Sequence, residues 1–142
     1  MASILNAQEM TYLVKTAKAV GLSVIVVVAS KTQLLDVLHN VTGVSMIAIT
    51  SRNHFLWKID LSKADRILAD SEVKDAIREW KSKSENNLLI QEGFASPEDL
   101  AMTRTSGAVD AVLVGEEVLS RCEDFNEEGY ALSLKAWIGN QI

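Results

Sequence analysis

Apolar residues recur with helical spacing near the start of the chain. Within residues 7–20 they lie three or four positions apart, the spacing that gathers side chains on one face of an α-helix. The apolar positions are Met10, Leu13, Val14, Ala17 and Val20. A glycine follows the last of them directly, and glycine commonly ends a helix. The pattern therefore predicts an amphipathic helix over residues 7–20.

Four other stretches have the pattern of β-strands. Residues 22–29 and 44–50 are continuous apolar runs, rich in β-branched residues and without alternation, which is typical of parallel strands covered on both faces. Two shorter runs follow at residues 87–91 (NLLIQ) and 111–114 (AVLV). We predict four strands, all short and largely buried.

Helical patterns separate these strands. Ser30 can cap a helix whose apolar stripe consists of Leu34, Leu35, Val37 and Leu38, and residues 61–69 and 71–83 give two further helices. The sequence Ser96-Pro97-Glu98-Asp99 starts another, and residues 115–122 and 127–138 give the last two. Because each connection between strands contains a helix, the strands are expected to be parallel with right-handed crossovers.

The length of 142 residues predicts a single α/β domain over residues 1–142. Two architectures suit the order of elements: an open, flavodoxin-like parallel sheet, or consecutive units of a TIM barrel. A whole barrel needs about 250 residues, so four strands amount to at most half of one. A half barrel would leave strand edges and one sheet face to be covered by something else.

Composition narrows the possible partners. The chain is 48% hydrophobic and 23% charged, as ordinary folded proteins are. A net charge of −5 opposes binding to nucleic acid, and no apolar run approaches the roughly 20 residues of a membrane span. With one cysteine and two histidines, neither an internal disulfide nor a zinc site is expected, which fits a soluble protein in a reducing compartment without metal or cofactor.

Motifs at the predicted strand ends resemble those of one enzyme family. Residues 47–53 (IAITSRN), followed by IDL at 59–61, are similar to the strand-six motif I-G-I-N-N-R-N/D-L and the downstream V-D-L of indole-3-glycerol phosphate synthase. Residues 91–99 (QEGFASPED), 111–117 (AVLVGEE) and 21–30 resemble its motifs at strands seven, eight and five. The resemblance covers residues 4–124 and is greatest to the plant branch.

This resemblance implies the second half of a (β/α)8 barrel, with strands equivalent to strands five to eight. The family closes an indole ring in tryptophan biosynthesis, with loss of carbon dioxide and water, at the C-terminal ends of its strands. Its strand-five glutamate falls on Val27, its strand-six asparagine on Thr50, its strand-seven glutamate on Gln91 and the following serine on Glu92. Two carboxylates are thus replaced by groups that cannot exchange a proton near neutral pH.

Other family positions are retained. The resemblance assigns phosphate binding to Gly93, Gly115 and Glu116, and makes Arg52 a candidate ligand contact. Two of them have a structural alternative: Gly115 can serve a tight turn, and Arg52 can form a salt bridge. Glu92 is either a displaced general base or a solvated, paired carboxylate. The family's catalytic lysines belong to early strands, which the matched region does not include.

We therefore expect a non-catalytic, synthase-like domain that serves as a binding or assembly module. The expected partners are a second copy or a larger protein assembly, and possibly a phosphorylated small molecule. The alternative is part of a synthase, a carbon–carbon lyase, whose other half supplies the lysines. A third hypothesis is an independent, flavodoxin-like phosphate or nucleotide binder. The resemblance to plant members suggests the plastid stroma.

Overall fold

The computed structural model describes residues 1–53, 56, 58–94, 96, 98–99, 109–115, 129–131 and 135. Helices and strands alternate along most of this region. In chain order they are α1 (Ala7–Ala19), β1 (Ile25–Val28), α2 (Lys31–Asn40), β2 (Met46–Thr50), β3 (Arg52–Asn53), β4 (Lys58–Ile59), α3 (Ser62–Ala69), α4 (Ser71–Ser82), β5 (Leu88–Glu92) and β6 (Ala111–Leu113). The predicted elements up to residue 92 are all present, although β1 and β2 begin later than their apolar runs.

Polar side chains define where the helices begin. Asn6 accepts hydrogen bonds from the backbone N–H groups of Gln8 and Glu9, and the Glu9 carboxylate accepts one from the N–H of Asn6. Ser30 caps α2 as predicted, by accepting from the N–H of Gln33. These contacts satisfy N–H groups that have no partner within the helix.

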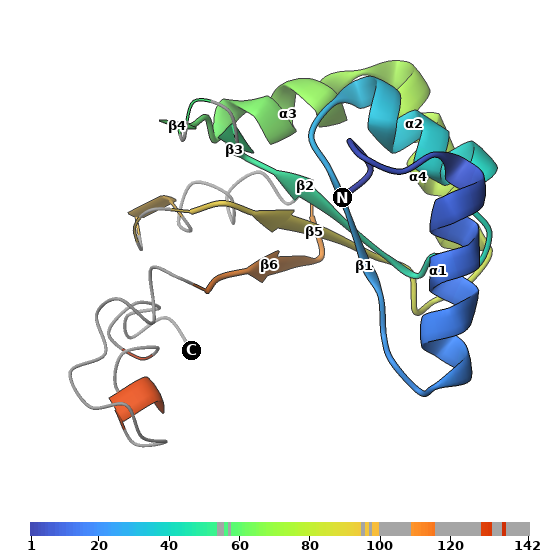
Figure 1. The fold of residues 1–142 in the computed structure, drawn as a ribbon. Helices are drawn as coiled ribbons and strands as arrows, with labels where there is room; N and C mark the ends of the chain where they lie inside the picture. Colours follow the sequence, from blue (N-terminus) through green and yellow to red (C-terminus); the bar gives the residue numbers. More distant parts are fainter. Residues whose placement is uncertain are drawn as a thin grey trace.

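The order of the strands decides between the two architectures. The four-stranded sheet runs β1-β2-β5-β6, and every neighbouring pair is parallel. Because each right-handed crossover steps in the same direction, the connecting helices lie on one face of the sheet. Figure 1 shows α1 to α4 along that side. A flavodoxin-like sheet reverses its strand order, so that alternative is wrong, and the half-barrel prediction is confirmed.

The sheet register separates two faces. Val26, Ile47 and Leu89 lie in one row and pack in the core with the helices. The opposite side, which we call the open face, carries Ile25, Val27, Met46, Ala48, Thr50, Leu88, Ile90, Glu92, Ala111 and Leu113. The hydrophobic core therefore lies between the sheet and the helices, and the open face would be the interior of a closed barrel.

The helix α1 is less buried than its apolar pattern indicates. Met10 and Val14 are in the core, but Leu13 is 48% exposed and Val20 is 69% exposed. Within the described residues, α1 stands at the end of the helix layer and packs chiefly against α2. Only the flank facing α2 and the sheet is covered, so the five-residue stripe overestimated the buried face.

A small antiparallel pair was not predicted. The strands β3 and β4 pair Arg52 with Ile59 and Asn53 with Lys58, in a region whose pattern indicated a loop. Strands of two residues are too short to show an alternating pattern. The pair places the start of α3 close to the end of β2, where Asp60 N donates to Ser51 O at 2.9 Å.

Several predictions fall outside the described residues. Ser96 and Asp99 exchange hydrogen bonds, as expected for the start of a helix, but residues 100–108 are not described. Glu116, Cys122 and most of the predicted helices at 115–122 and 127–138 also lie outside. Within the predicted helix at 127–138, only residues 129–131 and 135 are described, and they are helical.

Candidate functional site

The carboxyl ends of the strands bring together three of the four positions that the sequence resemblance matched to the family's active-site residues. Thr50 of β2 and Glu92 of β5 are paired in register. Val27 of β1 is paired with Ala48, two residues before Thr50 along β2. All three belong to the open face. Val27 and Glu92 are half-buried and Thr50 is fully buried, its hydroxyl accepting from the N–H of Arg52 at 3.2 Å.

Gln91 points the other way. It is in register with Ile49, which packs in the helix-side core, and only 3% of it is exposed. Its side-chain amide donates to the hydroxyl of Ser51 at 3.0 Å. Neighbouring residues of a strand face opposite sides. Gln91 and Glu92 therefore cannot both face the candidate site, which the alternation in this segment could already have indicated.

Gly93 is required by the local geometry. Its φ is +87°, and an added Cβ would lie 2.9 Å from the backbone nitrogen of Arg52 and 3.3 Å from that of Ser51. The same strand ends are joined by a hydrogen bond from Ser51 N to Glu92 O. Only glycine allows β2 and β5 to approach this closely in this conformation.

Gly115 differs from Gly93. It has no positive φ, and an added Cβ would meet no described atom within 4 Å. The described structure therefore does not require glycine for a tight turn or close packing there. Glu116, the third phosphate-binding candidate, lies outside the described residues.

A lysine that the sequence analysis missed stands near Glu92. Burial lowers the pKa of the Lys63 ammonium, while the carboxylates of Asp60 and Glu92 oppose that shift. Lys63 is in the first turn of α3, which the β3–β4 pair holds beside the strand ends. Its position at the helix start, directly after a strand, was the available signal. Glu92 thus shares its surroundings with a half-buried amine.

Asp60 precedes α3 and is held by side chains of that helix. Arg66 Nη2 contacts Asp60 Oδ2 at 2.6 Å, and Ser62 Oγ donates to Asp60 Oδ1 at 2.7 Å. These hydrogen bonds, first that from Arg66, lower the pKa of Asp60. Arg52, the predicted ligand contact, is half-buried in β3. The charged groups at this end thus come mainly from the segment between β2 and α4.

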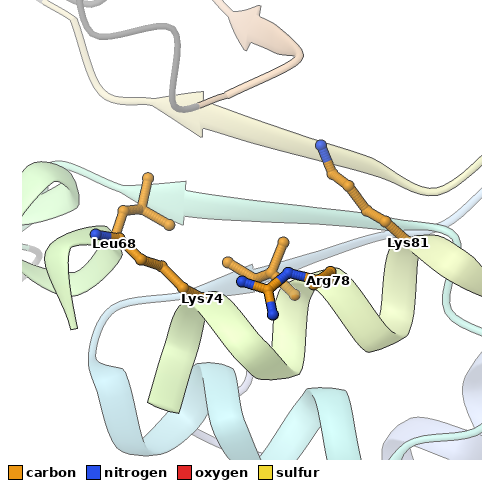
Figure 2. Close-up of a pocket in the computed structure, with 5 residues that line it drawn as sticks. Leu68, Lys74, Arg78 and Lys81 are labelled. Carbon is orange, nitrogen blue, oxygen red and sulfur yellow. The ribbon is translucent and has the colours of Figure 1, made fainter. Parts of the chain in front are cut away.

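A hollow lies on the helix layer, away from the strand ends (Figure 2). Its volume is about 440 Å³, and Leu68, Lys74, Ile77, Arg78 and Lys81 line it. Arg78 pairs with Asp75 at 2.9 Å, and Lys81 pairs with Asp110 at 2.6 Å. The interleaved charges of α4 thus form ion pairs on a mixed-charge face, and this hollow contains none of the family positions.

Two further kinds of feature are absent from the described part of the chain. It contains no group of three histidine, cysteine, aspartate or glutamate residues placed to hold a metal ion. Among the same residues, no helix is long and apolar enough to cross a membrane.

Comparison with known proteins points to the enzymes that the strand-end motifs resemble. The chain is 30% identical over 121 residues to the indole-3-glycerol phosphate synthase of Rippkaea orientalis, which covers 85% of this chain and 39% of that protein. It is 28% identical to the enzyme of Acaryochloris marina, covering 84% of this chain and 37% of that protein. Its identity to the chloroplastic enzyme of Arabidopsis thaliana is also 28%, covering 85% and 28%. No protein-family model matches the chain.

The matched region covers most of this chain but less than half of each relative. The chain spans between 28% and 39% of the length of these three proteins. Its four parallel strands in consecutive order, with helices on one face, are what part of a barrel of this family provides. The chain is thus related to the indole-3-glycerol phosphate synthases, over most of its own length and over part of theirs.

Proposed function

We propose that this chain is a non-catalytic, synthase-like module that acts in binding or assembly. The observation that carries the proposal is the chemistry at the family's carboxylate positions. Val27 has no titratable group, and Gln91 is neutral and donates to Ser51 on the helix side. General acid–base catalysis needs groups that gain and lose a proton near the working pH.

The open face supports the assembly role. Ile25 and Leu88 are each 38% exposed on it, and Leu113 is 41% exposed. Together with half-buried Val27 and Met46, they form an apolar surface that the helices do not cover. Ile25, Met46 and Leu88 are neighbours in one row, whereas Ala48 and Ile90, between that row and Leu113, are buried. Exposed apolar side chains on such a face favour an interaction site.

The sheet edges support the same role. On the outer side of β1, Ala2 N donates to Val27 O at 2.9 Å, so the N-terminal residues occupy part of that edge. Within the described residues, β6 has only β5 as a neighbour. Unpaired strand edges readily accept another strand. A second copy or another protein that covers the open face and the β6 edge would satisfy both surfaces.

Light scattering of the purified chain over a range of concentrations tests this proposal. We expect self-association of the wild type, and a monomer for Leu113→Lys, which places a charge on the open face. Thr32→Lys is the matched control because Thr32 is exposed on α2, on the other side of the sheet. A wild-type monomer that also captures no partner protein and leaves the open face free of dye binding would refute the assembly role.

The second candidate function is a share in synthase activity, with another chain supplying the lysines. It is favoured by Gly115, where the described atoms leave open space beside a position the family uses for phosphate. The test mixes this chain with the remaining portion of the Rippkaea orientalis enzyme and follows indole-3-glycerol phosphate formation. Activity that needs both parts would establish this function and overturn the non-catalytic one, whereas no activity with both parts folded would eliminate it.

The proposed compartment rests on one relative. The Arabidopsis thaliana protein is described as chloroplastic, which supports the plastid stroma. A fluorescent fusion of the full coding sequence, imaged in leaf cells, tests this placement. Fluorescence outside the plastid would contradict it.

A further inference from the structure

A pocket lies at the amino ends of the strands, opposite the end that carries the family positions. Its volume is about 400 Å³, near the lower limit for pockets that bind small molecules. The ends of α1, α2 and α4 and the loops that lead into β2 and β5 form its walls. The pocket is therefore separate from the candidate site described above.

The charged side chains among the described residues of this pocket are both lysines. Lys18 and Lys83 line it beside His39, and none of the described lining residues is an aspartate or glutamate. Lys83 is paired with Glu79 at 2.9 Å, a contact between exposed side chains of one helix. In the described part of the chain, no carboxylate forms an ion pair with Lys18. Such a lining favours an anion although the whole chain is acidic.

Neutral donors lie among these basic groups. Thr42, Ser45 and Ser84, whose side chains carry hydroxyl groups, are among the lining residues. Gly43 has a φ of +82°, a backbone conformation that favours glycine, and Lys18 Nζ lies 3.8 Å from the point where a Cβ on Gly43 would be. Hydroxyl and ammonium donors are the groups that bind carboxylate or phosphate oxygens.

The rest of the wall is apolar and well held. Leu38, Val41 and Val44 are buried there beside Trp80. The indole N–H of Trp80 donates to Val44 O at 3.2 Å, and Asn87 Nδ2 donates to Trp80 O at 2.7 Å. The indole is thus fixed in place before any ligand arrives, which reduces the entropic cost of binding.

We propose that this pocket binds a small organic anion that carries one carboxylate or phosphate group on a compact apolar body. The anionic group contacts Lys18 and the neighbouring hydroxyls, and the apolar body lies against the wall around Trp80. This binding does not depend on the proposed assembly role, because none of the open-face residues lines the pocket.

Nuclear magnetic resonance titration of the whole chain tests the proposal. The probes are benzoate, phenyl phosphate and inorganic phosphate, with benzylamine as the cationic control. We expect benzoate or phenyl phosphate to shift the amide signals of Gly43 and Ser84, and benzylamine to leave them unchanged. Benzoate against phenyl phosphate distinguishes the two anionic groups, and inorganic phosphate shows whether the apolar body is needed.

Variants of α1 make the test specific. Lys18→Met should weaken binding about tenfold, the effect of losing one charge-assisted hydrogen bond. Lys18→Arg should retain it, and Lys15→Met, an exposed lysine outside the pocket, should leave it unchanged. Equal affinity for wild type and Lys18→Met, equal shifts with benzylamine, or shifts confined to Gly93 and Val114 would each overturn the proposal.

Discussion

At the scale of single residues, the two glycines retained from the family motifs have different structural roles. Gly93 has a positive φ and lies against the backbone of Ser51 and Arg52, whereas a Cβ added at Gly115 would meet no described atom within 4 Å. From the sequence, the resemblance assigns both to phosphate binding, and Gly115 can also be explained by a tight turn. The structure shows that Gly93 is needed for folding regardless of any ligand.

We predict that Gly93→Ala lowers the free energy of unfolding by about 1–3 kcal/mol, the cost of a strained backbone conformation. Gly115→Ala is the matched control and should change it by less than about 0.5 kcal/mol. Urea unfolding followed by circular dichroism measures both. Similar losses for the two variants would mean that the close approach of β2 and β5 is not what Gly93 provides.

At the scale of elements, Asp110 connects three of them. Its Oδ2 accepts from Leu89 N of β5 at 2.7 Å, its Oδ1 accepts from Lys81 Nζ of α4 at 2.6 Å, and β6 begins at the next residue. Burial acts to raise the pKa of Asp110, but the hydrogen bonds from Lys81 and Leu89 outweigh it and the pKa is lowered. The folded state therefore favours the ionised carboxylate.

Since the pKa of Asp110 is lower in the folded than in the unfolded state, its contribution is present above about pH 4 and is lost as the pH falls through the folded value. We predict that Asp110→Asn costs about 1–2 kcal/mol at pH 7 and less at pH 3. Asp75→Asn, which removes an exposed ion pair with Arg78, should cost less than about 0.5 kcal/mol. Urea unfolding at both pH values is the measurement. A cost for Asp110→Asn that stays the same at pH 3 would contradict this assignment.

Two neighbouring helices, α1 and α2, differ in how deeply their leucines are buried. Leu34 on α2 is fully buried, while Leu13 on α1 is about half exposed. We predict that Leu34→Ala lowers the free energy of unfolding by about 2–5 kcal/mol, as large-to-small core changes do. Leu13→Ala makes the same chemical change and should cost less than about 1 kcal/mol when the chain is a monomer. Thermal unfolding at low concentration compares the two, and equal costs would show that α1 is covered on both flanks.

At the scale of the whole molecule, the central feature of the described residues is a sheet whose helices lie on one face. A closed barrel fills its interior with side chains from all its strands. Here four strands supply one half of such an interior, and Ile25, Leu88 and Leu113 remain exposed on it. The stability of the folded chain should therefore depend on whatever covers this face.

We predict that the midpoint of thermal unfolding rises with protein concentration, because association that requires the folded state stabilises it by mass action. For Leu113→Lys the midpoint should not change with concentration. Scanning calorimetry over a hundredfold range of concentration measures the dependence. A concentration-independent midpoint for the wild type would argue against self-association through the open face.

Local pattern was sufficient to predict much of the fold. The continuous apolar runs gave buried parallel strands, and Ser30 and the helical spacing of α2 gave a helix with the correct start. These features follow from side-chain period and capping chemistry, which act within a few residues. The strand-end motifs also predicted the family that the comparisons support.

What only the tertiary structure decided depends on contacts between distant segments. The consecutive order of the strands excluded the flavodoxin-like sheet, and the register placed Glu92 on the open face and Gln91 behind it. The exposure of Leu13 and the electrostatic influence of Glu92 on Lys63 likewise depend on which elements are neighbours. Side-chain period fixes the alternation within a strand, but pairing between strands decides which face is covered.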